Sequence, residues 1–196
     1  MSVVRAFVAV DLESEITERL AQVLAELRQQ VDGRIVRWVP AENIHLTLKF
    51  LGDVSVHNLP LLEDALRAEA LGRSAFALSV GGLGAFPSEN QPRVLWVGVE
   101  APDVLMALQR GIESRVERLG YAREKRPFNP HLTLGRVSRS ATAREVRQVA
   151  RLLREYKLGF LGVSEVEAVH LFRSDLRPAG AVYTRLFSAP LAERTA

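Results

Sequence analysis

The sequence lacks several features that define common classes of protein. It contains no cysteine, which excludes a disulfide scaffold, a thiolate zinc site and a cysteine nucleophile. No apolar run approaches the ~18 residues that a membrane span needs, and the start has too few apolar residues for a secretory signal. No phosphate loop with its lysine occurs, so ATP-driven chemistry is not indicated. We therefore expect a globular, cytoplasmic protein without a membrane association.

Lysine is rare, and arginine supplies nearly all of the positive charge. The chain of 196 residues carries 26 basic and 23 acidic side chains, and only three of the basic ones are lysine. Arginine binds phosphate through two parallel hydrogen bonds, which suits a nucleic-acid partner. A biased genome composition would produce the same excess, so the charge permits such a partner without requiring one. Apolar residues make up 47% of the chain, which is enough to form a core.

The spacing of apolar residues predicts an α+β protein in which helices and strands alternate. Apolar residues at helical spacing predict helices that begin at the cap Ser14, near Leu59, near Val104 and at the cap Thr142. Gly52 and the residue after it are expected to end the strand that precedes the second helix. The expected strands are 3–10, 34–39, 44–51, 76–86, 93–100, 131–137, 158–173 and 181–188, with a hairpin loop at 174–180 and a frayed tail from residue 189.

The order of these elements occurs twice, which indicates an internal duplication. Three pairs of equivalent positions, Phe7 with Leu95, His45 with His131 and Phe76 with Phe160, are separated by 88, 86 and 84 residues. We expect one bilobal domain over 1–190, with halves of roughly 1–90 and 91–190 and a tail at 191–196. Duplicated units commonly pair about a pseudo-two-fold axis, so equivalent residues should meet in a shared cleft.

The two halves share one tetrapeptide, His-Leu-Thr-Leu, at 45–48 and at 131–134. Because side chains alternate along a strand, the histidine and threonine of each copy point one way and the two leucines the other. The leucines suit a core, so the histidine and threonine belong to a functional face. A single His-x-Thr is more often structural, but two copies at equivalent places in a duplication favour chemistry.

Two such faces across a cleft suit acid–base catalysis at a phosphodiester. Imidazole titrates near neutrality, so one histidine can take a proton from water while the other gives one to the departing oxygen. Threonine hydroxyls can donate to the phosphate oxygens. Two histidines without an evident third histidine or carboxylate on the same faces make a poor zinc site.

The segments around the tetrapeptides resemble a known family. RAFVAVDL (5–12), WVPAENIHLTLKFLGDV (38–54) and PFNPHLTLGR (127–136) are similar to the two-histidine phosphoesterase superfamily. Within it, the closer resemblance is to the bacterial and archaeal RNA 2′,3′-cyclic phosphodiesterases, also described as 2′-5′ RNA ligases. This resemblance implies a bilobal α+β fold with two antiparallel sheets that line a central groove and helices packed outside.

The resemblance also implies an activity and a role for each residue of the two motifs. The expected reaction is hydrolysis of a terminal 2′,3′-cyclic phosphate on RNA to a 2′-phosphate, without metal or cofactor. His45 would donate a proton to the leaving 3′ oxygen, His131 would accept the proton of the attacking water, and Thr47 and Thr133 would hold the phosphate. The two histidine roles depend on the orientation of the substrate, and the reverse 2′-5′ ligation would exchange them.

Other basic side chains near the motifs are candidates for phosphate binding. Lys49 continues the face of the first histidine, although a solvated position at the rim is equally expected. Arg136 matches an arginine of the family pattern, but simple alternation aims it away from the groove unless a bulge intervenes. Arg126 precedes the second motif and could face the RNA backbone. His57 and His170 lack the motif context, and we expect no catalytic role for them.

Aromatic side chains near the motifs could stack on a terminal base. Trp38 and Phe128 lie by the turns before the motifs and are the better candidates, with Tyr183 as a further one. Phe50 falls on the leucine face by alternation and is expected in the core.

Two other functions remain open. The chain could be an RNA-end binding module without turnover, or a phosphodiesterase that acts on a small cyclic nucleotide. The expected partner is RNA with a 2′,3′-cyclic phosphate end, including tRNA fragments, and a monomer is expected.

Overall fold

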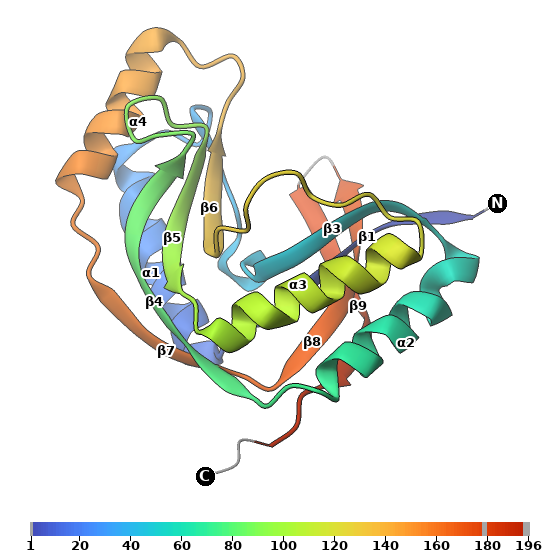
Figure 1. Cartoon of the computed structure of the whole chain (residues 1–196). Helices are drawn as coiled ribbons and strands as arrows, with labels where there is room; N and C mark the ends of the chain where they lie inside the picture. Colours follow the sequence, from blue (N-terminus) through green and yellow to red (C-terminus); the bar gives the residue numbers. More distant parts are fainter. Residues whose placement is uncertain (1, 178–179, 194–196) are drawn as a thin grey trace.

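The computed structural model describes residues 2–177 and 180–193, which form two arms that meet at an angle (Figure 1). Four α-helices and nine strands are found in these residues, together with two short 3₁₀ turns, η1 (Ala41–Asn43) and η2 (Val56–Asn58). None of the described helices has the length and apolar character to cross a membrane. The elements are β1 (Val3–Val10), α1 (Ser14–Gln30), β2 (Val36–Trp38), β3 (Leu46–Ser55), α2 (Leu59–Ala70), β4 (Phe76–Phe86), β5 (Val94–Glu100), α3 (Asp103–Arg118), β6 (His131–Val137), α4 (Ala143–Glu155), β7 (Phe160–Val166), β8 (Ala168–Arg177) and β9 (Gly180–Pro190).

The strands form one antiparallel sheet in the order β7-β4-β5-β6-β3-β1-β8-β9, and β2 pairs with β6. Strands β3, β1, β8 and β9 make the first arm, and β7, β4, β5, β6 and β2 make the second arm. The arms are joined where β3 meets β6, through the pairing of Leu46 with Leu132. The predicted α+β fold with antiparallel strands is confirmed, and its two sheets are joined into one by this pair.

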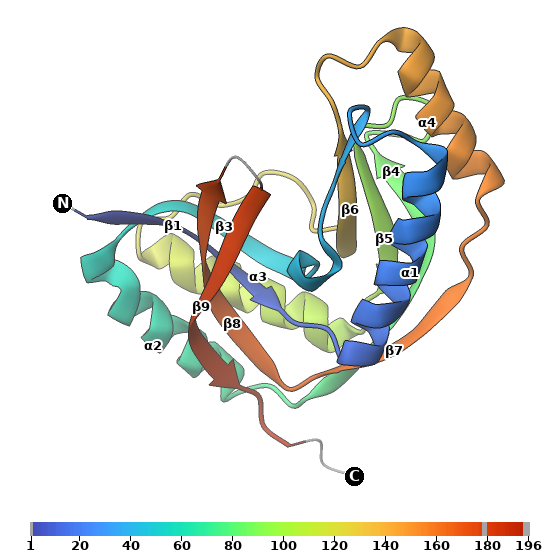
Figure 2. The ribbon, with the colours of Figure 1, turned by 180° about the vertical axis from the view of Figure 1, so that it is seen from behind.

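The helices cover the outer faces of the two arms and leave the inner face of the bent sheet free (Figures 1 and 2). In each half of the sequence, the first helix follows a strand of one arm but packs on the other arm. Helix α1 follows β1 of the first arm but packs on β7 of the second, where the Glu13 N–H donates to Ser164 Oγ at 2.9 Å. Helix α3 follows β5 of the second arm but packs on β3 and α2 of the first. The two arms therefore do not coincide with the two halves of the sequence.

One continuous hydrophobic core lies between the sheet and the helices. The leucines of both motifs belong to it, and Leu46, Leu48, Leu132 and Leu134 are at most 3% exposed. The two motif histidines are only half-buried. Alternation along β3 and β6 therefore puts the leucines in the core and the histidines on the inner face, as the sequence predicts.

Three strand predictions are wrong in extent. Strand β3 continues through Gly52, because this glycine adopts φ 71° at a register shift and the pairing with β1 resumes beyond it. The segment 158–173 is two strands, because the chain passes from the second arm to the first at Glu167. Strand β8 extends to Arg177 and strand β9 begins at Gly180, so most of the expected loop 174–180 is strand. Residues 178–179 lie outside the described residues.

The expectation of a frayed tail from residue 189 is wrong for the residues that the structure describes there. Ala189 is fully buried, and the Ala192 N–H donates to the Arg73 carbonyl at 2.8 Å, so the tail is held against the first arm up to this point.

Of the two helix caps expected from the sequence, the one at Thr142 is confirmed, with a reciprocal bond to Glu145. Ser14 is the first residue of α1 and not its cap, and the cap position has no side-chain hydrogen bond.

Candidate active site

The two motif histidines are held in the same way. His45 Nδ1 lies 2.9 Å from the Asn43 carbonyl oxygen, and His131 Nδ1 lies 2.7 Å from the Asn129 carbonyl oxygen. A carbonyl only accepts hydrogen bonds, so Nδ1 carries the hydrogen in both rings. Nε2 is therefore the nitrogen that takes up or gives away a proton, in both histidines.

The strand register brings the two motifs together about a local two-fold axis. Leu46 of β3 lies opposite Leu132 of β6 in an antiparallel pair. On the other face, antiparallel pairing sets His45 across from Thr133 and His131 across from Thr47. Each imidazole thus faces the hydroxyl of the other motif, and one phosphate group between them would meet two histidines and two threonines.

A bulge follows each motif and reverses the alternation of side chains. Leu48 has no partner in the β1–β3 register, and Leu134 has none in the β5–β6 register. After a bulge, the next residue points to the same side as the bulged one. Lys49 is therefore buried beside Leu48, and Phe50 returns to the inner face.

The bulge after the first motif overturns the expected positions of Lys49 and Phe50, and the bulge after the second motif turns Arg136 toward the inner face. Lys49 reaches neither the groove nor the rim, because its Nζ donates to Glu113 of α3 at 2.5 Å and to the Ala122 carbonyl at 2.6 Å. Phe50 is not in the core and is 62% exposed. Arg136, the counterpart of Phe50 in the second motif, is exposed on the inner face, because the structure has the bulge on which this position depended.

Aromatic rings surround both histidines. His45 stacks on Phe7 with ring centroids 4.7 Å apart, and the edge of Tyr183 contacts it at 5.1 Å. His131 meets Phe86 edge to face at 4.9 Å. Tyr183, a candidate for stacking on a terminal base, lies next to the first histidine, where the two rings are in edge contact.

Burial lowers the pKa of both histidines below the ordinary value of 6.5, and the hydrogen bond to the backbone carbonyl opposes this. The two rings differ in the charged group that acts on them. The carboxylate of Asp11 raises the pKa of His45, whereas the guanidinium of Arg136 lowers the pKa of His131. The two charges therefore act on the two imidazoles in opposite directions, on top of the burial that lowers the pKa of both.

A pocket of about 250 Å³ opens beside His45. Asp11 lies in its wall, ion-paired with Arg185 and 3.7 Å from His170 Nε2. The ring of His170 is buried, and its Nδ1 lies 2.9 Å from Ser188 Oγ. The sequence analysis missed Asp11 and Arg185; only the end of the first strand at Asp11 was visible in the pattern.

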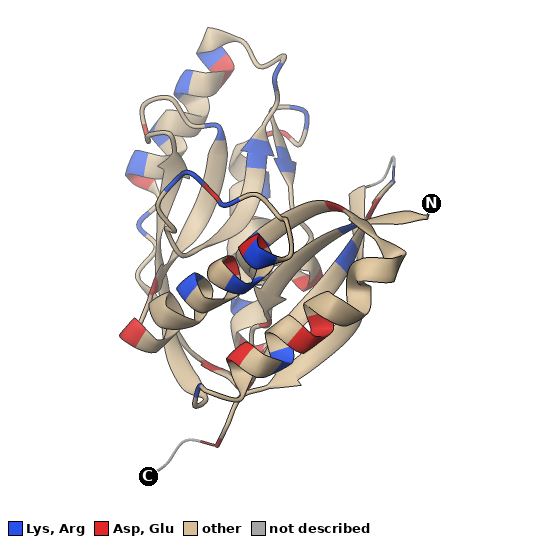
Figure 3. Cartoon of the chain, turned by 45° about the vertical axis from the view of Figure 1, so that its right-hand side comes forward, with Lys and Arg blue, Asp and Glu red and all other residues tan. Residues whose placement is uncertain are grey.

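Basic residues border the inner face next to the motifs. Arg37 of β2 lies opposite Arg136 of β6, and Figure 3 shows blue segments side by side on strands of the second arm. Burial raises the pKa of Tyr183, and the charges of Arg136, Arg5 and Arg37 all lower it. These three arginines therefore lie within electrostatic reach of one point beside His45. The sequence analysis did not single out Arg5 or Arg37 as basic residues of the inner face.

The remaining candidates lie farther from the histidines. The indole of Trp38 packs over Gly135 on the buried side of the sheet, so the structure does not offer it to a base. Arg126 and Phe128 border a hollow of about 150 Å³ against α3, and neither motif histidine lines it. His57 is exposed in η2, before α2. Trp96, which the sequence analysis did not single out, pairs with Thr133 and lies over Gly84 on the inner face.

Among the described residues, no group of three or more histidine, aspartate and glutamate side chains is arranged to hold a metal ion. Near the two imidazoles, hydroxyl and guanidinium groups are the hydrogen-bond donors, and the Asn43 and Asn129 carbonyls accept from Nδ1. The hydroxyl and guanidinium donors suit an anionic phosphate ester.

Known proteins match the chain along its length. The sequence model of the LigT like Phosphoesterase family matches twice, at residues 10–96 and 97–183. An RNA 2′,3′-cyclic phosphodiesterase of Methanothermobacter thermautotrophicus is 37% identical over 181 residues, which cover 92% of this chain and 95% of the relative. A second RNA 2′,3′-cyclic phosphodiesterase, from Archaeoglobus fulgidus, is 37% identical over 93% of this chain and 97% of its own length.

Solved structures share the fold. The crystal structure of TT0787 of Thermus thermophilus has a TM-score of 0.80 and 30% identity and covers 97% of this chain and 100% of that one. E. coli LigT complexed with 3′-AMP has a TM-score of 0.78 and 27% identity, over 98% and 100% of the two chains. With its motif repeated in each half and both histidines intact, the chain belongs to the LigT like phosphoesterase family.

Proposed function

We propose that this protein hydrolyses a 2′,3′-cyclic phosphate at the 3′ end of RNA to a 2′-phosphate, with His45 as proton donor and His131 as proton acceptor. The observation that carries the proposal is the matched pair of imidazoles, each bound through Nδ1 to a backbone carbonyl so that Nε2 is the nitrogen that titrates. The names of the matched relatives support the same substrate.

In the proposed reaction, His131 Nε2 takes a proton from water as the water oxygen attacks phosphorus. The bond from phosphorus to the 3′ oxygen breaks, and His45 Nε2 gives that oxygen a proton. The products are a 2′-phosphate and a 3′-hydroxyl. Thr47 and Thr133 donate hydrogen bonds to the non-bridging oxygens, and Arg136 balances the negative charge that builds up in the transition state.

The charges around the two histidines favour this division of roles. A general acid must be protonated before reaction and a general base must not be. Asp11 raises the pKa of His45 and Arg136 lowers the pKa of His131, while burial lowers the pKa of both rings, so these two charges act in the direction that the division of roles requires. Ligation in the reverse direction would use the same groups with their roles exchanged.

The test uses a short RNA that ends in a 2′,3′-cyclic phosphate, with excess EDTA, and separates 2′- from 3′-phosphate products. We expect wild-type protein to form the 2′-phosphate, and His45→Ala and His131→Ala each to lower turnover on the order of 10²–10⁴-fold. His57→Ala, which removes an exposed histidine, is the matched control and should retain full activity. Activity that EDTA abolishes would contradict a metal-independent mechanism.

Two added measurements, RNA affinity and turnover of a free 2′,3′-cyclic mononucleotide, separate the two alternatives. A module that only binds RNA ends would form no product while RNA affinity remained. An enzyme for a small cyclic nucleotide would turn over a free 2′,3′-cyclic mononucleotide and leave the RNA unchanged. We further propose that the enzyme acts as a monomer in the cytoplasm, with tRNA fragments among its substrates; equilibrium sedimentation tests the monomer.

A further inference from the structure

The two histidine motifs alone hardly distinguish one orientation of the substrate from the other. Each motif offers an imidazole that titrates at Nε2 and a threonine hydroxyl, related by the axis at the Leu46–Leu132 pair. A cyclic phosphate turned about this axis would meet the same groups with its 2′ and 3′ oxygens exchanged. A group outside the motifs must therefore decide which oxygen faces His45.

The first positions at which the two halves differ on the inner face are 50 and 136. Both follow the bulge after a motif, and both are the next inner-face side chain beyond the threonine. One is Phe50 and the other is Arg136, so a flat apolar ring lies on one side of the axis and a cation occupies the equivalent position on the other. These positions lie roughly 7 Å along the strand from the threonines, which is comparable to the separation of phosphate and base within one nucleotide.

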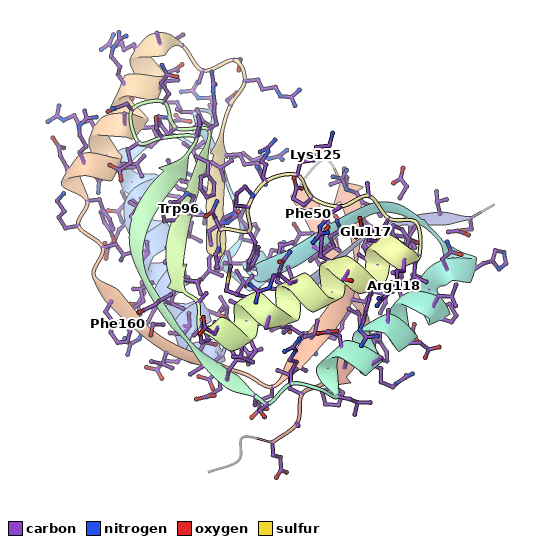
Figure 4. All side chains as sticks on the ribbon, viewed as in Figure 1. Phe50, Trp96, Glu117, Arg118, Lys125 and Phe160 are labelled. Carbon is purple, nitrogen blue, oxygen red and sulfur yellow. The ribbon has the colours of Figure 1, made fainter. Side chains whose placement is uncertain are left out.

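Phe50 has a free face. Its ring contacts Phe7 at a tilt, with centroids 6.1 Å apart, and 62% of the residue is exposed. Phe7 in turn stacks on His45, so Phe50 is the outer member of a series of rings that starts at the histidine. Figure 4 labels Phe50 on β3, with Lys125 on the loop that passes over it in this view.

The opposite side of the axis carries the charge that a phosphate needs. Arg136 and its strand neighbour Arg37 lie there, whereas Arg5 lies on β1, next to β3 in the first arm. An aromatic face binds any nucleobase by stacking, and guanidinium groups bind phosphate oxygens. Beyond the two threonines, the inner face therefore carries a ring that suits a base on one side of the axis and a pair of guanidinium groups that suits phosphate on the other.

We propose that Phe50 is the platform for the terminal nucleobase and thereby fixes the orientation of the cyclic phosphate, an inference that rests on the proposed function. With the base on Phe50, the 3′ oxygen faces His45, and cleavage leaves the 2′-phosphate. In the turned orientation the bond from phosphorus to the 2′ oxygen breaks, His45 protonates that oxygen, and the product is the 3′-phosphate.

The test compares wild-type protein with Phe50→Leu, Phe50→Trp and a control, Phe160→Leu. Phe160 is 70% exposed on β7, far from the inner face of the first arm (Figure 4), so the control removes an equally exposed ring. The substrate is a short RNA with a 2′,3′-cyclic phosphate end, and the readouts are KM and the ratio of 2′- to 3′-phosphate. The Kd of adenosine 2′-phosphate, measured by calorimetry, is a readout that does not need turnover.

We expect Phe50→Leu to raise KM and Kd on the order of tenfold and to form a mixture of 2′- and 3′-phosphates. Phe50→Trp should restore the single product, and Phe160→Leu should match the wild type. Unchanged KM, Kd and product ratio in Phe50→Leu would overturn the inference, as would an equal loss in Phe160→Leu. A wild-type protein that forms no product contradicts the proposed function instead, and the Kd values then still decide whether Phe50 binds the base.

Discussion

Two backbone carbonyls set the same tautomer in both motif histidines. The carbonyl oxygens of Asn43 and Asn129 fix the hydrogen on Nδ1 in both rings, and nearby charges then make the two rings unequal. The tautomer therefore follows from the turn before each strand, and the protonation state from side chains elsewhere on the inner face.

The pH dependence of kcat/KM should be bell-shaped. The rising limb reports loss of the proton from His131 and the falling limb reports its loss from His45. Because burial lowers both pKa values, we expect the maximum below the ordinary histidine value of 6.5. Asp11→Asn should move the falling limb to lower pH, and Arg136→Met should move the rising limb to higher pH. Movement of either limb in the other direction would contradict the assignment.

Removal of one partner of the Lys49–Glu113 ion pair should strongly destabilise the protein. Both side chains are at most 6% exposed, and loss of one partner leaves a buried charge unpaired. We expect Lys49→Met to lower the free energy of unfolding by about 3–5 kcal/mol.

Urea unfolding of Lys49→Met, Glu113→Gln and the double variant measures this effect as a double-mutant cycle. The double variant should lose clearly less than the sum of the single losses. Arg151→Ala breaks an exposed ion pair with Glu155 and serves as the control, with an unchanged midpoint. Additive losses in the double variant would show that the two residues do not act as a pair.

At the scale of elements, the bulges after the motifs determine what surrounds the site. The alternation from His45 to Leu48 could be read from the sequence because it is a local property of a strand. The residues beyond it could not, because a bulge depends on the register with the neighbouring strands β1 and β5. The positions of Lys49 and Phe50 were therefore wrong, and that of Arg136 depended on a bulge that only the structure showed.

The two expected helix caps offer a matched comparison at this scale. Thr142 accepts from the Glu145 N–H at 3.3 Å, whereas Ser14 makes no capping bond. We expect Thr142→Ala to cost about 1 kcal/mol of stability and Ser14→Ala to cost little. Thermal unfolding followed by circular dichroism measures both. Equal losses would contradict the cap assignment, and activity should be unchanged in each variant.

At the scale of the whole molecule, the exchange of helices between arms ties the two halves of the chain together. Helix α1 is bound to β7 through Ser164, and through the bond from Arg19 to the Leu161 carbonyl at 2.5 Å. Helix α3 is bound to β3 through the Lys49–Glu113 pair. Each sequence half therefore buries its first helix only in the presence of the other half.

Separate fragments 1–90 and 91–196 should consequently not fold alone. We expect each to lack a cooperative thermal transition, and an equimolar mixture to recover one, because only then are α1 and α3 packed on their sheets. Circular dichroism of the fragments and of their mixture measures this. A cooperative transition in either fragment by itself would show that the half is an independent unit.

The sequence by itself determined the duplication, the α+β class, the two histidine motifs and the family resemblance. These depend on residue type and on strand alternation, which are local and repeat in both halves. The tertiary structure decided the single joined sheet, the exchange of helices, the bulges and the charges of Asp11 and Arg136 beside the histidines. Those features arise from strand pairing and packing between residues far apart in the chain, such as Leu46 with Leu132, and no local pattern encodes them.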